Sequence, residues 1–139
     1  MAAVFADTNI VVYAYGSDAV KASVAERIIE AAPVISTQVV NEFLNIARVK
    51  MGLDMATRHR VATDLLHGCS VIALDSTIVT SAMVIEDRYH LSYWDALIAA
   101  AALAANCDTL YSEDFQNGQV FEGKLTVSNP FVNPAEIKP

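Results

Sequence analysis

The stretch Val4-Phe5-Ala6-Asp7-Thr8-Asn9 decides the fold, because it joins a short, continuously apolar run to a polar turn. Consecutive apolar residues bounded in this way are typical of a strand buried on both faces of a parallel sheet. Similar short runs recur along the chain and alternate with longer segments of helical periodicity. The other predicted strands are Val34–Ser36, Val71–Leu74, Thr109–Tyr111 and Leu125–Ser128. This alternation predicts an α/β fold with a central parallel sheet of about five strands flanked by helices.

Apolar periodicity and end signals predict helices between these strands. The predicted helices are Ile10–Tyr15, Ala19–Ala32, Thr37–Val49, Met55–Leu66, Thr77–Tyr89 and Ser92–Ala105. Pro33 ends the second helix, and Ser36 or Thr37 caps the third. The segment Ser92–Ala105 is apolar all round, which predicts a buried helix.

Length and composition indicate one domain spanning residues 1–139. The segment 129–139 contains three prolines, and we expect it to run over the surface. The longest uncharged stretch, Ala96–Cys107, is too short to span a bilayer, and no basic segment precedes the first apolar residues. We therefore expect a cytoplasmic protein that does not enter the membrane.

The charged and metal-binding residue types exclude several function classes. Cys69 and Cys107 lack C-x-x-C spacing, so buried free thiols are favoured over a zinc or redox site. The formal net charge of −7 argues against a protein that coats nucleic acid through Lys and Arg. Four of the nine basic residues nevertheless cluster along the sequence: Arg48, Lys50, Arg58 and Arg60. This cluster either holds RNA phosphates or is a solvated connection between two helices.

Four acidic residues that are far apart in the sequence are candidates for one shared pocket. Asp7 and Asp114 each follow a predicted strand, and ligands collect beyond the carboxyl ends of parallel strands. Glu42 lies inside a predicted helix, and Asp95 interrupts the most apolar segment of the chain. Carboxylates in such positions are costly unless their charge is offset. A divalent metal ion would offset it.

Each of these acids also has a purely structural interpretation. Asp7 can cap the helix that follows it, and Glu42 can be solvated on a polar helix face. The segment Ser92-Tyr93-Trp94-Asp95 matches the capping-box pattern S-x-x-[DE], and Asp114 can be an ordinary loop acid. Asp75 is interpreted as a helix cap.

Taken together, four segments resemble the PIN-domain ribonucleases and, more narrowly, the VapC-type toxins of bacterial toxin–antitoxin pairs. The segments are Asp7-Thr8-Asn9, Gln38–Asn45, Trp94–Ala101 and Leu110–Phe115. The resemblance extends over essentially the whole chain, as far as Phe131. It implies a PIN-like fold, hydrolysis of RNA phosphodiester bonds and a cognate antitoxin protein as partner.

The resemblance also implies roles for individual residues. The candidate catalytic and metal-binding residues are Asp7, Glu42, Asp95 and Asp114. Asp7 and Asp95 would hold the main Mg²⁺ or Mn²⁺ ion, while Glu42 and Asp114 would hold a second ion or orient water. The supporting hydrogen-bonding residues would be Thr8, Asn9 and Ser112. Ser112 departs from the threonine that is often found there but keeps the hydroxyl group.

Two other classes of protein share features with this sequence. A non-catalytic PIN-like binding module would share the fold, although all four acids are present. A receiver-like signalling domain with an acidic Mg²⁺ pocket would need paired acids after the first strand and a Lys after a late one, and this sequence has neither.

The high apolar fraction predicts a homodimer, because helices such as Ile10–Tyr15 carry more apolar surface than one small core needs.

Overall fold

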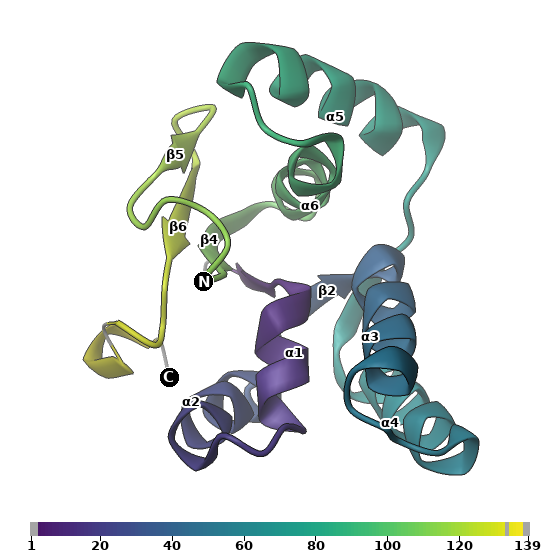
Figure 1. The fold of residues 1–139 in the computed structure, drawn as a ribbon. Coiled ribbons are helices and arrows are strands. Elements are labelled where there is room, and N and C mark those ends of the chain that lie inside the picture. Colours follow the sequence, from purple (N-terminus) through teal and green to yellow (C-terminus); the bar gives the residue numbers. More distant parts are fainter. Residues whose placement is uncertain (1–2, 133, 138–139) are drawn as a thin grey trace.

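The structure, a computed structural model, describes residues 3–132 and 134–137 and contains a central sheet with helices on either side (Figure 1). The strands are β1 (Ala3–Ala6), β2 (Val34–Ser36), β3 (Ser70–Ile72), β4 (Cys107–Tyr111), β5 (Val120–Phe121) and β6 (Leu125–Ser128). The helices are α1 (Thr8–Ala14), α2 (Ala19–Glu30), α3 (Thr37–Val49), α4 (Met55–Gly68), α5 (Ser76–Tyr89) and α6 (Tyr93–Ala104), followed by the short 3₁₀ helix η1 (Pro134–Glu136). In Figure 1, α5 and α6 lie above the central strands and the other α-helices lie below them.

The sheet has the strand order β3-β2-β1-β4-β6-β5. Neighbouring strands pair in parallel, except for the antiparallel pair formed by β5 and β6. The predicted α/β fold is therefore confirmed. In this order β1 and β4 are neighbours at the centre, so the residues that follow them meet at one edge of the sheet.

The sheet has six strands where about five were predicted, and the additional strand is β5. This two-residue strand is joined to β6 by a tight turn with positive φ at both Glu122 and Gly123. Such turns favour Asn-Gly or Asp-Gly, so Glu-Gly is a weak signal. Tertiary contacts hold Glu122 instead: its N–H donates to the Tyr89 hydroxyl, and its carboxylate pairs with Arg88. The third predicted strand also differs, since it covers Ser70–Ile72 and not Val71–Leu74.

Local capping explains where several helices begin. Ser36 caps α3, Asp75 caps α5 and Ser92 caps α6, each by accepting a backbone N–H three residues further on. The interpretation of Asp75 as a helix cap is confirmed. Helix α6 is buried from Ala96 to Ala102, as its composition predicted.

The distribution of apolar surface corrects one premise of the predicted homodimer. Ile10 and Val11 of α1 are fully buried, and of the predicted helix Ile10–Tyr15 only Tyr15, with 40% of its surface exposed, is among the exposed large apolar residues. Helix α5 offers a larger group of such side chains, at Val79, Met83 and Val84. Among the described residues, no helix is long and apolar enough to cross a membrane.

The first part of the proline-containing tail packs on the domain. Pro130 is buried, and the ring of Phe131 meets Tyr13 edge to face at a centroid distance of 4.9 Å. Beyond it, residues 132, 134 and 135 are exposed, as expected for a surface segment. Residues 133, 138 and 139 of the predicted tail lie outside the described part of the chain.

Candidate functional site

A cleft of about 270 Å³ lies at the carboxyl ends of β1 and β4. All four predicted acids line it: Asp7, Glu42, Asp95 and Asp114. They come from four different parts of the chain, namely the turn after β1, the middle of α3, the first turn of α6 and the loop after β4. The parallel crossovers therefore bring together carboxylates separated by as many as 107 positions in the sequence.

Asp7 is buried deep in this cleft, with 4% of its surface exposed. One carboxylate oxygen accepts the Thr8 N–H at 2.7 Å, so Asp7 caps α1 as the structural interpretation predicted. The other accepts the Ser112 hydroxyl at 2.8 Å. The pKa of Asp7 is raised to about 7, chiefly by burial and to a smaller extent by the charges of Asp114 and Glu42, against the lowering effect of its two hydrogen bonds. Near neutral pH this carboxyl group gains or loses a proton readily.

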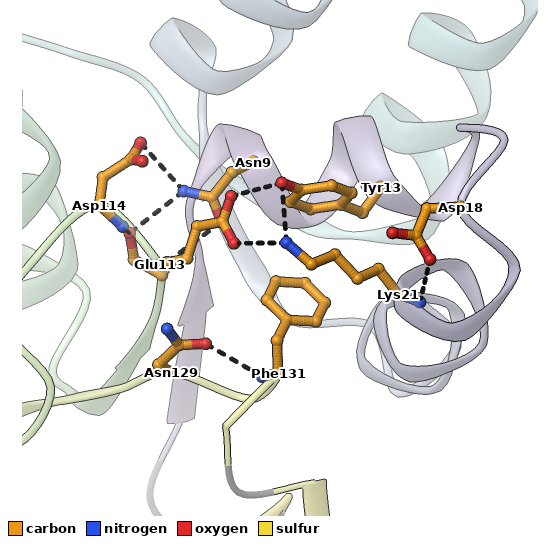
Figure 2. Close-up of polar contacts among 9 residues, drawn as sticks. Asn9, Tyr13, Asp18, Lys21, Glu113, Asp114, Asn129 and Phe131 are labelled. Carbon is orange, nitrogen blue, oxygen red and sulfur yellow. Dashed lines mark hydrogen bonds and ion pairs between the residues drawn. The ribbon is translucent and has the colours of Figure 1, made fainter.

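Ser112 connects the acids on the strand side of the cleft. Its hydroxyl is fully buried and, besides donating to Asp7, accepts the Asn9 amide at 3.2 Å and the Asp114 N–H at 3.1 Å. The same Asn9 amide donates to the Asp114 carboxylate at 3.1 Å, as Figure 2 shows. Two of the predicted supporting residues, Asn9 and Ser112, thus orient Asp7 and Asp114.

The helix side of the cleft carries Glu42 and Asp95, both half-buried. The Gln38 amide nitrogen donates to Glu42 at 2.6 Å and to the Trp94 carbonyl at 3.3 Å. The Asp95 N–H donates to the Ser92 hydroxyl at 3.2 Å, which confirms the predicted cap of α6. Burial raises the pKa of both Glu42 and Asp95, and the nearby charge of Asp114 raises both further. The negative charges of Glu42 and Asp95 therefore both repel that of Asp114.

Glu113 is a fifth acid in the cleft that the sequence analysis did not single out. The Tyr13 hydroxyl donates to it at 2.5 Å, and Lys21 forms an ion pair with it at 3.1 Å (Figure 2). The Lys21 ammonium also lies 4.3 Å from the Tyr13 ring centroid and 5.2 Å from that of Phe131. Glu113 is thus neutralised by contacts across 92 and 100 sequence positions, which no local pattern could reveal.

The donor atoms in the cleft fit a hard divalent cation. Within residues 3–132 and 134–137, no three His, Cys, Asp or Glu side chains converge into a ready-made metal-binding group. Mg²⁺, however, keeps several waters and needs only one or two carboxylates. Two buried side-chain oxygens that belong to cleft residues, Thr8 Oγ1 and Gln38 Oε1, have no hydrogen-bond partner among the described residues. The Thr8 side chain does lower the pKa of Glu42, so it lies near that carboxyl group. A water molecule of a hydrated cation would supply the partner that Thr8 Oγ1 lacks.

The predicted basic cluster is divided by the structure. Lys50 lines the acidic cleft, whereas Arg48 and Arg60 are exposed on α3 and α4. Arg58 is half-buried and donates to the Leu53 carbonyl at 3.0 Å, which ties it to the loop between the two helices. Of these four residues, Lys50 alone stands beside the acids.

Comparison with known proteins gives one family match. The model of the PIN domain family matches residues 4–118. The search of curated proteins returns no match.

Several solved structures have a similar fold. A toxin–antitoxin complex from Klebsiella pneumoniae matches with a TM-score of 0.67 and 23% identity, over 93% of this chain and 98% of that chain. The VapC20 toxin of Mycobacterium tuberculosis, described as cleaving the sarcin–ricin loop, matches with a TM-score of 0.66 and 18% identity, over 82% of this chain and 92% of that chain. FitAcB from Neisseria gonorrhoeae matches with a TM-score of 0.64 and 16% identity, over 92% and 98%. At these identities the likeness shows a shared fold.

Proposed function

This chain belongs to the PIN domain family, and on that premise we propose that it is a metal-dependent ribonuclease that hydrolyses RNA phosphodiester bonds. The observation that carries the proposal is the convergence of Asp7, Glu42, Asp95 and Asp114 on one cleft. Four carboxylates in a cleft destabilise one another unless a cation is present. Burial, and to a smaller extent the charges of the neighbouring acids, raises the pKa of three of them, Asp7, Glu42 and Asp95. The neutral hydrogen-bonding residues Asn9 and Ser112 orient the acids but leave their charge in place.

We propose that Asp7 and Asp95 hold Mg²⁺ or Mn²⁺. When bound, such an ion supplies Lewis-acid stabilisation of phosphate oxygens and lowers the pKa of a water molecule. Asp7 would hold the ion as a carboxylate, and the hydrogen bonds from Thr8 and Ser112 keep its two oxygens in place. Glu42 and Asp114, on opposite sides of the cleft, either bind a second ion or accept a proton from the attacking water.

RNA is the proposed substrate, and its phosphates require the cation because the cleft is otherwise acidic. Lys50 is the basic side chain best placed to contact a neighbouring phosphate, and Arg48, Arg58 and Arg60 would extend that contact along α3 and α4. The similarity in fold to a toxin that cleaves the sarcin–ricin loop supports RNA as the polymer. We expect the reaction to take place in the cytoplasm.

Cleavage of labelled RNA by the purified chain tests this function. We expect cleavage with Mg²⁺ or Mn²⁺, products that carry a 5′ phosphate, and no cleavage in excess chelator. Full activity in chelator would refute the metal-dependent mechanism. RNA binding without cleavage, in either metal, would identify the chain as a non-catalytic member of the family.

We further propose that the protein is the VapC-type toxin of a toxin–antitoxin pair and is inhibited by a small antitoxin. The toxin–antitoxin complex from Klebsiella pneumoniae and the VapC20 toxin, both of similar fold, support this. An Arg or Lys of the antitoxin could occupy the acidic cleft in place of the cation. Expression of the chain alone should arrest growth, and co-expression with the product of the adjacent upstream reading frame should relieve it. Failure to relieve toxicity, with no complex formed, would count against the antitoxin.

A homodimer is the proposed assembly, with the exposed residues Val79, Met83 and Val84 of α5 as the apolar surface available for it. Light scattering at high micromolar concentration should give about twice the mass of one chain. A protein that stays monomeric there contradicts the proposal.

A further inference from the structure

A second groove adjoins the acidic cleft and is built around Trp94. It has a volume of about 620 Å³, its apolar wall includes Leu74 and Leu97, and it shares Gln38, Glu42 and Trp94 with the cleft. The Trp94 side chain is 66% exposed, although tryptophan is among the most costly side chains to leave in water. Its ring contacts Tyr93 edge to face at 5.7 Å. A large aromatic surface is therefore presented next to the proposed reaction site.

The chemistry of this groove favours a flat, neutral group over a phosphate. None of the described residues that line it is Lys, Arg or His, and Glu42 adds a negative charge. The remaining polar groups are amides and a hydroxyl, contributed by Gln38, Asn41 and Thr37. Aromatic and aliphatic walls with amide edges are the features with which proteins stack and hydrogen-bond unpaired bases.

Gln38 provides an independent sign that a ligand is missing from this place. It is 7% exposed, and its side-chain nitrogen donates to two acceptors, the Glu42 carboxylate and the Trp94 carbonyl. These two acceptors fix the orientation of the amide, which leaves Gln38 Oε1 buried without a donor. A buried oxygen of this kind is satisfied by an incoming N–H group, and every nucleobase carries one on its pairing edge except where it is modified.

We propose that Trp94 is a stacking platform for a nucleobase of the RNA substrate and that Gln38 Oε1 accepts a hydrogen bond from the edge of that base. This inference rests on the proposed ribonuclease function. Trp94 lines both the groove and the acidic cleft, so a base on its ring would belong to a nucleotide close to the phosphate bound at the acids. Stacking tolerates any base, whereas the single acceptor of Gln38 selects the orientation in which the base presents a donor.

The chain contains one tryptophan, so its intrinsic fluorescence reports on Trp94 alone. The probe is a short single-stranded RNA in Mg²⁺, added to an Asp114→Asn variant that slows cleavage and leaves the groove intact. The matched probe is the same oligonucleotide with abasic ribose at every position. At equal occupancy, measured by anisotropy of an end label, the intact RNA should quench the fluorescence and the abasic RNA should leave it unchanged.

Substitutions supply a second readout that does not depend on fluorescence. Trp94→Ala should raise KM for a short RNA roughly 5- to 150-fold, the range that corresponds to the loss of one stacked base, with a smaller change in kcat. Trp94→Phe should retain part of the affinity because it keeps an aromatic face. Val120→Ala removes another exposed apolar side chain, from β5 outside the groove, and should leave KM unchanged. Melting curves of the variants control for folding.

Several outcomes would overturn the inference. RNA that binds without quenching, or equal quenching by the abasic probe, would show that no base stacks on Trp94. A shift of the emission with protein concentration in the absence of RNA would show that a second copy covers the groove, and a shift caused by an antitoxin but not by RNA would assign it to that partner. Cleavage by a wild type that shows no quenching refutes the stacking alone, whereas base-dependent quenching without cleavage refutes the ribonuclease and supports the stacking.

Discussion

The acidic cleft has a strand wall, which carries Asp7 and Asp114, and a helix wall, which carries Glu42 and Asp95, and the two walls differ in how their acids are held. On the strand wall, one buried hydroxyl, that of Ser112, joins Asp7, Asn9 and Asp114 into a continuous network of hydrogen bonds. On the helix wall, Glu42 and Asp95 are half-buried and repel Asp114 across the cleft. Neutral donors are present on both walls, since the Gln38 amide donates to Glu42 at 2.6 Å, but only on the strand wall does one hydroxyl group link two of the acids. A change on the strand wall should therefore cost stability, and a change on the helix wall should cost activity first.

The largest expected effect is on activity, at the helix wall. Asp95→Asn should reduce the rate of cleavage by about 100-fold or more. The reason is that a neutral amide neither balances the charge of a divalent cation nor holds it in place as a carboxylate does. It should not destabilise the metal-free protein, since the cap of α6 uses the Asp95 N–H and the raised pKa of Asp95 reflects an unfavourable charge. The measurements are cleavage rates and thermal melts in chelator.

The same melts in Mg²⁺ complete the test of Asp95. Mg²⁺ should raise the melting temperature of the wild type, because a ligand that binds only the folded state stabilises it, and Asp95→Asn should blunt that rise. Asp87→Asn, which removes an exposed acid from α5, is the matched control and should change neither property. A variant that melts lower in chelator but keeps its Mg²⁺ response and its cleavage would leave Asp95 as a helix-capping acid, and the proposed function would fall with it.

The next effect is the pH dependence of stability, which comes from Asp7 on the strand wall. Its pKa in the folded protein is about 7, above the ordinary value of 3.8, so between these values the folded state holds a proton that the unfolded chain has released. The metal-free protein should therefore lose stability as pH rises from about 4 to 7, by on the order of 4 kcal/mol. Chemical denaturation at several pH values measures this.

Two comparisons sharpen the assignment of that pH dependence to Asp7. Asp7→Asn retains a good capping residue and should flatten the profile. Mg²⁺ should bind more tightly as pH rises through 7, since the proton must leave before the carboxylate can act as a ligand. Stability of the metal-free wild type that increases over this range would contradict the raised pKa.

A smaller loss of stability should follow from breaking the network of the strand wall. Ser112→Ala leaves the Asp7 carboxylate, the Asn9 amide and the Asp114 N–H without their shared partner, and the cost should be about 1–3 kcal/mol. Urea denaturation of the metal-free protein measures it, with the exposed Ser81→Ala on α5 as control. An effect no larger than that of the control would mean that the strand wall is not preorganised.

The smallest effect is expected at the rim of the cleft. Lys50→Ala should reduce the slope of RNA affinity against salt concentration by about one unit, with similar weakening for all sequences, if Lys50 contacts one phosphate. Replacing Arg48, Lys50, Arg58 and Arg60 together should flatten the slope further. If the fourfold variant binds RNA with an unchanged slope, the cluster is a solvated surface.

Sequence reasoning reached the strand-end acids because their positions follow from local rules. Apolar runs of strand length, each followed by an acid, place Asp7 and Asp114 at the carboxyl edge of a parallel sheet. Glu42 and Asp95 lie on helices, where the cost of an internal carboxylate made them candidates, and resemblance to a family supplied their roles. The structure brings all four to one cleft, and it divides the basic cluster that the sequence presents as a unit.

The sequence by itself determined the α/β order of elements and the helix caps at Asp75 and Ser92, and it limited the cap of α3 to Ser36 or Thr37, because each cap is a hydrogen bond between residues three positions apart. Only the tertiary structure decided that Lys21 forms an ion pair with Glu113 and that Gln38 donates to the Trp94 carbonyl. It also decided that the two-residue strand β5 forms one edge of the sheet. These contacts join elements that meet only after the crossovers have formed. Their partners are fixed by packing and charge across the folded molecule, so no periodicity in the chain records them.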